Sequence, residues 1–296
     1  MTWQDWKGKT PIWCAGCGDF GVLTAMQKTA EAMKLNPETT VLATGIGCSG
    51  SVTAYFRSFG IHGIHGRSLP LATGVKMANP DLTVLVAGGD GDGFGIGLGH
   101  FMHAARRNVD VTYIVMDNQV YGLTKGQTSP TTPTTMTTKA SPMGPMAVPL
   151  SPLAVALTGG ATYVAQAFSG NQAQLIELLS GAIRHKGFSF VNIQSPCVTY
   201  NHINTYDWFR TNMRDLASEG HDHRDLAEAY KVAQDNSTVP MGLLYQTTRP
   251  SLQETAHPWP ADEGAVSAVR TAFDAATSHS ASAAAFAGWS MEFQMR

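Results

Sequence analysis

The fold is decided by the stretch Leu82-Thr83-Val84-Leu85-Val86-Ala87-Gly88-Gly89-Asp90-Gly91-Asp92-Gly93. It begins as a short apolar run rich in valine and leucine and ends in a glycine-rich turn that carries two aspartates. An apolar run of this length, bounded by glycines, is typical of a strand buried on both faces of a parallel sheet. Open parallel sheets place their ligands at the carboxyl ends of their strands. The stretch therefore predicts an α/β fold with a polar site where this strand ends.

The segments on either side alternate between helix and strand, as a doubly wound sheet requires. A helix is predicted at about residues 96–107 and a buried strand at 111–116 that ends at Asp117-Asn118. Together with the first strand they make a βαβ unit. Further elements are predicted as helices at 22–33 and 172–185 and as strands at 40–44 and 188–193. We therefore expect a doubly wound, mostly parallel α/β sheet.

The two ends of the chain differ in composition. We expect one ligand-binding domain at residues 1–230, followed by a C-terminal extension at 231–296 that is rich in Pro, Thr, Ser and Ala. The extension shows no core pattern beyond an alanine-rich helix at 266–276, so we expect an extended tail that packs on a partner subunit. Residues 124–149 lose periodicity, and a long structureless loop of this kind usually serves as a functional cover or an interface segment.

Composition and charge exclude several classes of protein. The chain of 296 residues has 43 % apolar and 14 % charged residues, with 30 glycines. This composition fits a subunit that is partly covered by partner chains, and equally a compact monomer with a polar, uncharged surface. A net charge of −2 without basic runs argues against nucleic-acid binding. No apolar stretch is long enough to span a membrane and the N-terminus lacks a signal-peptide pattern, so we expect a cytoplasmic protein.

Asp90 and Asn118 form the strongest motif of the chain. Asp90 sits between glycines that allow close backbone approach, and Asn118 follows the next predicted strand. A carboxylate, an amide oxygen and the carbonyl of Val120 are oxygen ligands that suit Mg²⁺. This Gly-Asp-Gly to Asn layout is the pattern of enzymes that bind thiamine diphosphate (ThDP). The alternative is that the glycines only ease a tight turn between strand and helix.

A second glycine-rich loop, Gly45-Ile46-Gly47-Cys48-Ser49-Gly50, formally matches the dinucleotide-binding fingerprint. That fingerprint also needs an acidic residue about 20 positions later to bind the ribose. The next acidic residue is Asp81, so we reject a nicotinamide cofactor. The loop is interpreted instead as a second wall of the ThDP site.

The four cysteines are Cys14, Cys17, Cys48 and Cys197. In a reducing compartment they are metal ligands or free thiols rather than disulfides. Four thiolates suit structural zinc or a [4Fe–4S] cluster. Zinc sites usually pair two Cys-x-x-Cys knuckles, whereas here Cys48 and Cys197 are solitary and distant, which favours a cluster. Buried free cysteines remain the alternative.

At this point the sequence resembles the β subunit of 2-oxoacid:ferredoxin oxidoreductases, most closely the 2-oxoglutarate type. The motifs that carry the resemblance extend from residue 13 to residue 131, and Cys197 extends the match. They are Trp13-Cys14-Ala15-Gly16-Cys17-Gly18, Gly45-Ile46-Gly47-Cys48-Ser49, His65-Gly66-Arg67, Gly88-Gly89-Asp90-Gly91-Asp92, Arg106-Arg107-Asn108 and the run from Asp117 to Thr131.

The resemblance implies a ThDP-binding fold with three cofactor sites. ThDP would be held by Ile46, Gly47, Cys48, Ser49, His65, Gly91, Asp92, Gly122 and Leu123. Mg²⁺ would be held by Asp90, Asn118 and the Val120 carbonyl, and one [4Fe–4S] cluster by Cys14, Cys17, Cys48 and Cys197. Members of the family decarboxylate a 2-oxoacid oxidatively with coenzyme A, giving acyl-CoA, CO₂ and two electrons that leave one at a time to ferredoxin. The reverse reductive carboxylation also occurs in the family.

Three residues are candidates for direct roles in the reaction. In the family, a lysine at the position of Lys125 accompanies acceptance of 2-oxoglutarate, which would give succinyl-CoA, whereas pyruvate-type members resemble Gly-Met-Thr-Gly-Gly-Gln there. The alternatives are a lysine that contacts coenzyme A phosphates or solvent, and a preference for pyruvate or a broad range of 2-oxoacids. His65 and Arg67 could bind cofactor phosphate or steer protons, and His65 could equally be a structural hydrogen-bonding group.

One required group is missing from the motifs. ThDP enzymes activate the cofactor with a glutamate, and the glutamates of this chain lie outside the motifs. We therefore expect an α subunit to supply it, an (αβ)₂ assembly, and no activity for this chain alone. Two competing functions are a ThDP decarboxylase or synthase without a cluster and a zinc-stabilised, nucleotide-binding regulatory subunit.

Overall fold

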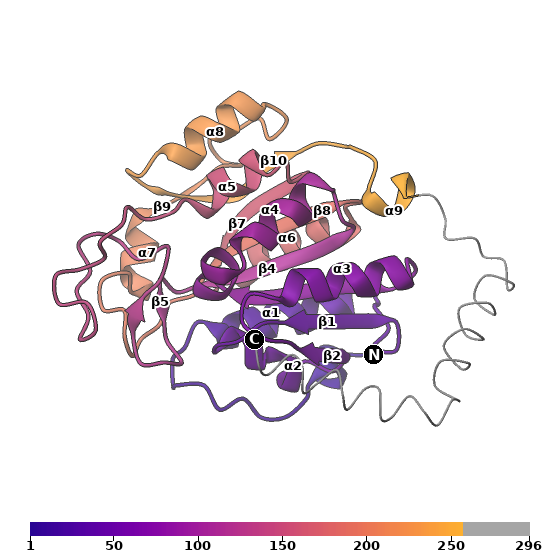
Figure 1. Ribbon diagram of the computed structural model, residues 1–296, viewed down its shortest axis with the longest axis horizontal. Coiled ribbons are helices and arrows are strands. Elements are labelled where there is room, and N and C mark those ends of the chain that lie inside the picture. Colours follow the sequence, from indigo (N-terminus) through magenta and orange to yellow (C-terminus); the bar gives the residue numbers. More distant parts are fainter. Residues whose placement is uncertain (257–296) are drawn as a thin grey trace, which may run out of the picture. The chain divides into compact units, whose positions relative to one another are not determined.

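A mostly parallel sheet of eight strands organises the protein in the computed structural model, which describes residues 1–256. Its order is β2-β1-β3-β4-β8-β7-β10-β9 (Figure 1). Neighbouring strands are parallel except for β7 and β10, which are antiparallel. The strands of this sheet are β1 (Thr40–Thr44), β2 (Phe59–His62), β3 (Thr83–Gly89), β4 (Val111–Asp117), β7 (Tyr163–Phe168), β8 (Phe188–Gln194), β9 (Met213–Asp215) and β10 (Val239–Gln246).

Helices cover both faces of the sheet, as Figure 1 shows for the central strands. Alternate strand residues supply the two cores: Leu85 and Ile114 pack with α1 and α6, whereas Val86 and Phe190 pack with α3, α4, α5 and α8. The α-helices are α1 (Asp19–Ala32), α2 (Val52–Tyr55), α3 (Ser68–Ala78), α4 (Leu98–Arg106), α5 (Pro152–Thr158), α6 (Gln172–Arg184), α7 (Tyr206–Asn212), α8 (Leu226–Gln234) and α9 (Leu252–Thr255). Short turns of helix lie at η1 (Trp3–Trp6), η2 (Ser49–Ser51) and η3 (Asp92–Ile96). Within residues 1–256, no helix is both long and apolar enough to cross a membrane.

The predicted doubly wound α/β fold is confirmed. All four predicted strands and all three predicted helices of the first 200 residues are present, with ends shifted by a few residues. The central strand β4 is buried along its whole length, because it lies between β3 and β8 and under helices on both faces. The edge strand β2 and the strand β7 were not predicted from the sequence.

The compact unit of the structure runs from Met1 to Thr255 and so includes residues 231–255 of the C-terminal extension expected at 231–296. Strand β10 belongs to the main sheet and pairs with β7. Pro240 and Gly242 argue against a strand when β10 is considered alone. Its place in the sheet comes from distant pairing, with a register shift between Leu243 and Tyr245. The alanine-rich helix expected at 266–276 lies outside the described residues.

The segment 124–149 is more ordered than a structureless cover. It begins within a small antiparallel hairpin of β5 (Val120–Tyr121) and β6 (Gln127–Thr128). After the hairpin the chain turns inward, and Ser129, Thr131 and Thr132 are buried. Its later residues include exposed apolar side chains, among them Met143 and Met146.

Candidate active site

A cavity of ≈ 290 Å³ lies at the carboxyl ends of β1, β3 and β4. All the residues predicted to hold ThDP and Mg²⁺ line it. Gly89, Tyr121 and Thr124 also line it and were not predicted as site residues. Arg67 and Lys125 are not among the lining residues. The full lining is Ile46, Gly47, Cys48, Ser49, His65, Gly89, Asp90, Gly91, Asp92, Asn118, Val120, Tyr121, Gly122, Leu123 and Thr124.

Asp90 and Asp117 are two buried carboxylates on adjacent strand ends, 1 % and 2 % exposed. Thr131 Oγ1 lies 2.8 Å from Asp90 Oδ2 and 3.0 Å from Asp117 Oδ1. Burial raises the pKa of Asp90, and burial together with the charge of Asp90 raises the pKa of Asp117 to about 7. Within residues 1–256 no lysine, arginine or histidine forms an ion pair with either group. A divalent cation fits such an uncompensated site, because buried charges need a partner.

Asn118 and Val120 follow at the end of β4 in a tight turn. The backbone N–H of Asn118 points to Asp90 Oδ1 at 3.4 Å, and Asn118 Oδ1 accepts a hydrogen bond of 3.0 Å from Val120 N–H. Gln119 between them has a positive φ of 62°, which makes the turn possible. Asp90, Asn118 and Val120 therefore all line one cavity and are linked by these contacts, and their role as metal ligands remains a prediction.

Asp92 holds the walls of the cavity together. Its Oδ1 accepts hydrogen bonds from Ile46 N–H (2.9 Å), Gly66 N–H (2.8 Å) and His65 Nδ1 (2.9 Å). A carboxylate that only accepts requires the proton of His65 on Nδ1, which fixes the tautomer of the ring. Gly45 packs so closely that a Cβ there would overlap the Asp92 carboxylate. Asp92 thus joins three parts of the chain that are distant in sequence.

The loops that carry the four cysteines contact one another at the edge of this cavity. Trp13 Nε1 donates to the carbonyl of Cys48 at 2.8 Å, and Gly18 N–H donates to the carbonyl of Pro196 at 3.1 Å. A Cβ at Gly122 would lie 3.7 Å from Cys48 Sγ and 3.8 Å from Cys197 Sγ, so both sulfur atoms lie beside the cavity wall.

The cysteines are free thiols in the structure, and Cys14 is exposed. Burial raises the pKa of Cys48 to about 11 and also raises the pKa of Cys17. In the described part of the chain, no three His, Cys, Asp or Glu side chains are close enough to hold a single metal ion. A [4Fe–4S] cluster separates its sulfur ligands more widely than one ion does, so four thiols on adjoining loops are compatible with a cluster, which remains a prediction.

Asp19 and Ser195, which the sequence analysis did not identify, join the first and last of these cysteine loops. Ser195 Oγ donates to Asp19 Oδ1 at 2.6 Å, and both residues are 1 % exposed. Asp19 begins α1 two positions after Cys17, and Ser195 precedes Cys197 by the same spacing. An acidic residue next to a cysteine motif was the only available sequence signal, and nothing in the sequence marks its distant partner.

Lys125 and Arg67 lie outside the cavity wall. Lys125 is exposed, has a positive φ of 79°, and occupies the turn of the β5–β6 hairpin directly after Thr124. Arg67 is half-buried at the start of α3. The pKa of His100 is lowered mainly by burial and further by the charge of Arg67. The direct roles predicted for Lys125 and Arg67 remain predictions.

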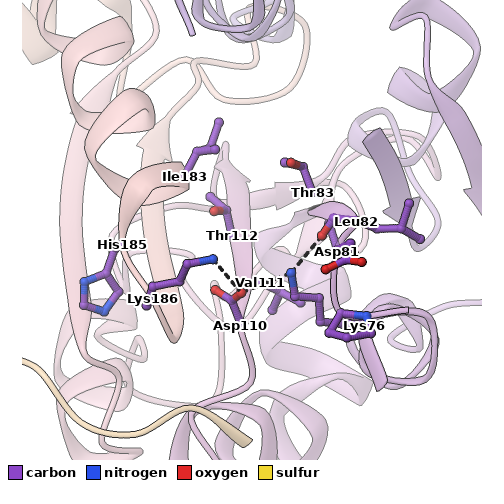
Figure 2. Close-up of a pocket in the computed structure, with 12 residues that line it drawn as sticks. Lys76, Asp81, Leu82, Thr83, Asp110, Val111, Thr112, Ile183, His185 and Lys186 are labelled. Atoms are coloured by element: carbon purple, nitrogen blue, oxygen red, sulfur yellow. Dashed lines mark hydrogen bonds and ion pairs between the residues drawn. The ribbon is translucent and has the colours of Figure 1, made fainter. Parts of the chain in front are cut away.

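A second hollow of ≈ 230 Å³ lies at the opposite, N-terminal ends of β3 and β4. Figure 2 shows Lys76 and Lys186 directed toward Asp110 from two sides. Lys76 Nζ is 3.0 Å from Asp110 Oδ2 and donates to the Leu82 carbonyl at 2.7 Å. Lys186 Nζ is 3.5 Å from the same carboxylate oxygen. These contacts pair the charges with one another, so we interpret this hollow as a structural ion-pair site.

The sequence matches known families along most of its length. Residues 45–193 match the family described as thiamine pyrophosphate enzyme, C-terminal TPP binding domain. Residues 197–259 match the family that describes the C-terminal part of the pyruvate ferredoxin oxidoreductase beta subunit.

Individual relatives agree with these families. The chain is 41 % identical over 266 residues to 2-oxoacid:ferredoxin oxidoreductase 2, subunit beta, of Aeropyrum pernix, covering 86 % of each chain. It is 35 % identical over 246 residues to 2-oxoglutarate synthase subunit KorB of Methanocaldococcus jannaschii, covering 83 % of this chain and 91 % of that one. Among solved structures it is similar to 2-oxoglutarate:ferredoxin oxidoreductase from Magnetococcus marinus with 2-oxoglutarate, coenzyme A and succinyl-CoA bound. That match has a TM-score of 0.85 and 42 % identity, and covers 91 % of this chain and 96 % of that one.

Proposed function

Since the chain belongs to the β subunits of 2-oxoacid:ferredoxin oxidoreductases, we propose that it catalyses the CoA-dependent oxidative decarboxylation of 2-oxoglutarate together with an α subunit. The products are succinyl-CoA, CO₂ and two electrons that pass through one [4Fe–4S] cluster to ferredoxin, and the reaction can run in reverse. The observation that carries this proposal is a cavity that joins a buried carboxylate site at Asp90 to the sulfur atoms of Cys48 and Cys197.

The cofactor site is proposed to hold ThDP with Mg²⁺. When bound, ThDP supplies a thiazolium ring that adds to the 2-oxo carbon and accepts the electron pair left as CO₂ departs. Asp90 offers the charge for the cation, with Asn118 and the Val120 carbonyl beside it. Gly91 lets Tyr121, another residue of the cavity wall, pack directly on the backbone, because a Cβ there would overlap the ring of Tyr121.

His65 is proposed to act on protons at the cavity. Its Nδ1 contact with Asp92 orients the ring, and its side chain is 32 % exposed, so Nε2 can reach a bound molecule. In the tautomer that carries the proton on Nδ1, Nε2 would be available to accept a proton. Arg67, two positions later, would serve as a nearby phosphate-binding charge.

The four cysteines are proposed to hold the cluster. Their loops are joined by hydrogen bonds, and Cys48 belongs both to this group and to the cavity wall. Electrons could therefore leave the cofactor site over a short path, since Gly122 has no side chain between the cavity and the two sulfur atoms.

Lys125 supports the choice of 2-oxoglutarate. An exposed ammonium group at the hairpin turn, next to the cavity-lining Thr124, suits a distal carboxylate of the substrate. Relatives named for 2-oxoglutarate and relatives named only for 2-oxoacids are both similar to this chain, so a broad range of 2-oxoacids is the second candidate.

An α subunit is proposed to complete the site, in an (αβ)₂ assembly. No glutamate is among the residues that line the cavity in the described part of the chain. The mouth of the cavity has exposed apolar side chains, Ile46 and Leu123, and Ile64 adjoins His65. Exposed apolar side chains around a site suit burial by a partner. Coenzyme A is proposed as the co-substrate that enters with this assembly.

The first test is reduction of a viologen dye by the anaerobically purified α–β complex with coenzyme A, comparing 2-oxoglutarate with pyruvate. We expect reduction that depends on both substrates and prefers 2-oxoglutarate, and no turnover by this chain alone. Preference for pyruvate would reject the substrate assignment, and an iron-free, active complex would reject the cluster.

A further inference from the structure

Thr131 lies in a loop and yet is 5 % exposed, which is unusual for a polar loop residue. Its neighbours Ser129 and Thr132 are buried as well, and Ser129 N–H donates to Thr132 Oγ1 at 2.7 Å. Burial of three hydroxyl-bearing residues is costly unless each finds a hydrogen-bond partner. The loop is therefore held in place by polar contacts.

The partners of the Thr131 hydroxyl are Ser129 Oγ, at 3.2 Å, and the two buried carboxylates of the candidate site. This hydroxyl lies 2.8 Å from Asp90 Oδ2 and 3.0 Å from Asp117 Oδ1. Asn192 Nδ2 also donates to Asp117 at 3.1 Å, so Asp117 has another hydrogen-bond donor. For Asp90, the contact with Thr131 is shorter than the contact with the Asn118 N–H. This hydroxyl group and the Asn118 N–H thus both contact the carboxylate proposed to hold the cation, and the hydroxyl group is the nearer of the two.

Asp90 also contacts both ends of one continuous segment. Asn118 N–H approaches Asp90 Oδ1 at the start of this segment, and Thr131 Oγ1 contacts Asp90 Oδ2 at its end. Between them lies the β5–β6 hairpin, which supplies five lining residues of the cavity and carries Lys125 at its turn. The segment that contains the hairpin and the proposed cation site therefore share one carboxylate, that of Asp90.

We propose that Thr131 is a positioning residue that couples occupation of the Asp90 site to the order of the hairpin 120–128. If the chain binds ThDP and Mg²⁺ as proposed above, binding of the cation at Asp90 stabilises the hairpin, which forms the wall of the cavity proposed to contact the 2-oxoacid. Coupling of this kind is reciprocal, so loosening the hairpin anchor weakens cofactor binding.

The test compares Thr131→Val with Thr131→Ser in the α–β complex. Valine keeps the shape and removes the hydroxyl, whereas serine keeps the hydroxyl. The matched control is Thr135→Val, a change at an exposed threonine of the same segment. Two quantities are measured: the Kd of ThDP at several Mg²⁺ concentrations, by calorimetry, and deuterium exchange of the amides of residues 120–128.

We expect roughly tenfold weaker ThDP binding and faster exchange at 120–128 in Thr131→Val, since a hydrogen bond to a charged group is lost. Thr131→Ser and Thr135→Val should stay within about twofold of the wild type. Wild-type ThDP affinity and wild-type exchange in Thr131→Val would overturn the proposal, as would an equal loss in Thr131→Ser.

The wild-type complex supplies a second test that needs no variant to fold. Addition of ThDP and Mg²⁺ should slow exchange at residues 120–128, and unchanged exchange in a complex that binds ThDP would overturn the coupling alone. A wild-type complex that binds no ThDP would instead refute the proposed function.

Discussion

Ser195→Ala should loosen the contact between the two loops that carry Cys17 and Cys197. Ser195 Oγ donates to Asp19 Oδ1 at 2.6 Å, and both side chains are buried. The other carboxylate oxygen of Asp19, Oδ2, is buried without a hydrogen-bond partner. The substitution therefore removes a main stabilising contact of a buried carboxylate.

The expected loss follows from the type of hydrogen bond. A bond to a charged group contributes about 1.5–3 kcal/mol. At about 2–4 °C per kcal/mol for a domain of this size, the melting temperature should fall by roughly 3–12 °C. Iron content should fall as well, because Cys197 is no longer held beside the first cysteine loop.

The loss should depend on pH. Burial raises the pKa of Asp19 to about 6, so its contribution to stability is present at low pH and is lost as pH rises through about 6. Ser195 lowers this pKa, so its removal raises the pKa further. The decrease in melting temperature should therefore be larger at pH 8 than at pH 5.

The assay is thermal unfolding of the anaerobic α–β complex at both pH values, with iron determined on the same samples. Ser218→Ala is the matched control, since Ser218 is exposed and its hydroxyl donates only to the Asp215 carbonyl. A Ser195→Ala complex with wild-type melting temperature and iron content would refute the argument that this hydrogen bond holds the two loops together.

Four further substitutions, two of them a matched pair, test other parts of the structure. Lys76→Met should lower the free energy of unfolding by about 2–3 kcal/mol, because it leaves the Asp110 carboxylate with only the longer contact to Lys186 and the backbone N–H of Gly187. Lys186→Met changes a side chain that is 77 % exposed and should alter the free energy of unfolding by less than about 0.5 kcal/mol. Chemical denaturation measures both changes. Lys125→Gly should reduce kcat/KM for 2-oxoglutarate by roughly tenfold and leave that for pyruvate within about twofold, since the proposed contact is to the distal carboxylate that only 2-oxoglutarate carries. Equal losses for both substrates in the viologen assay would exclude Lys125 as the selector. Asp90→Asn should weaken Mg²⁺-dependent ThDP binding at least tenfold, because the proposed Mg²⁺ site loses a carboxylate charge. Calorimetry measures this affinity, and an unchanged value would remove Asp90 from the proposed cation site.

Much of the site was predictable because its parts are local in sequence. The glycines beside Asp90 mark the end of one strand, and Asn118 marks the end of the next apolar run. Neighbouring parallel strands bring these two ends to the same edge of the sheet. The cavity accordingly collects every residue predicted to hold ThDP or Mg²⁺. Periodicity likewise predicted β3, β4 and β8, since strands buried on both faces consist of apolar residues throughout.

The sequence by itself determined the fold class, the family and the residue types at the strand ends, because these depend on short apolar runs and contiguous motifs. Only the tertiary structure decided the place of β10 in the sheet, the partnership of Ser195 with Asp19, and the contact of Thr131 with Asp90 and Asp117. Each of these joins segments that are distant along the chain, and a single sequence carries no signal for which buried polar group meets which. The physical reason is that buried carboxylates and edge strands take the partners that packing of the whole sheet brings to them.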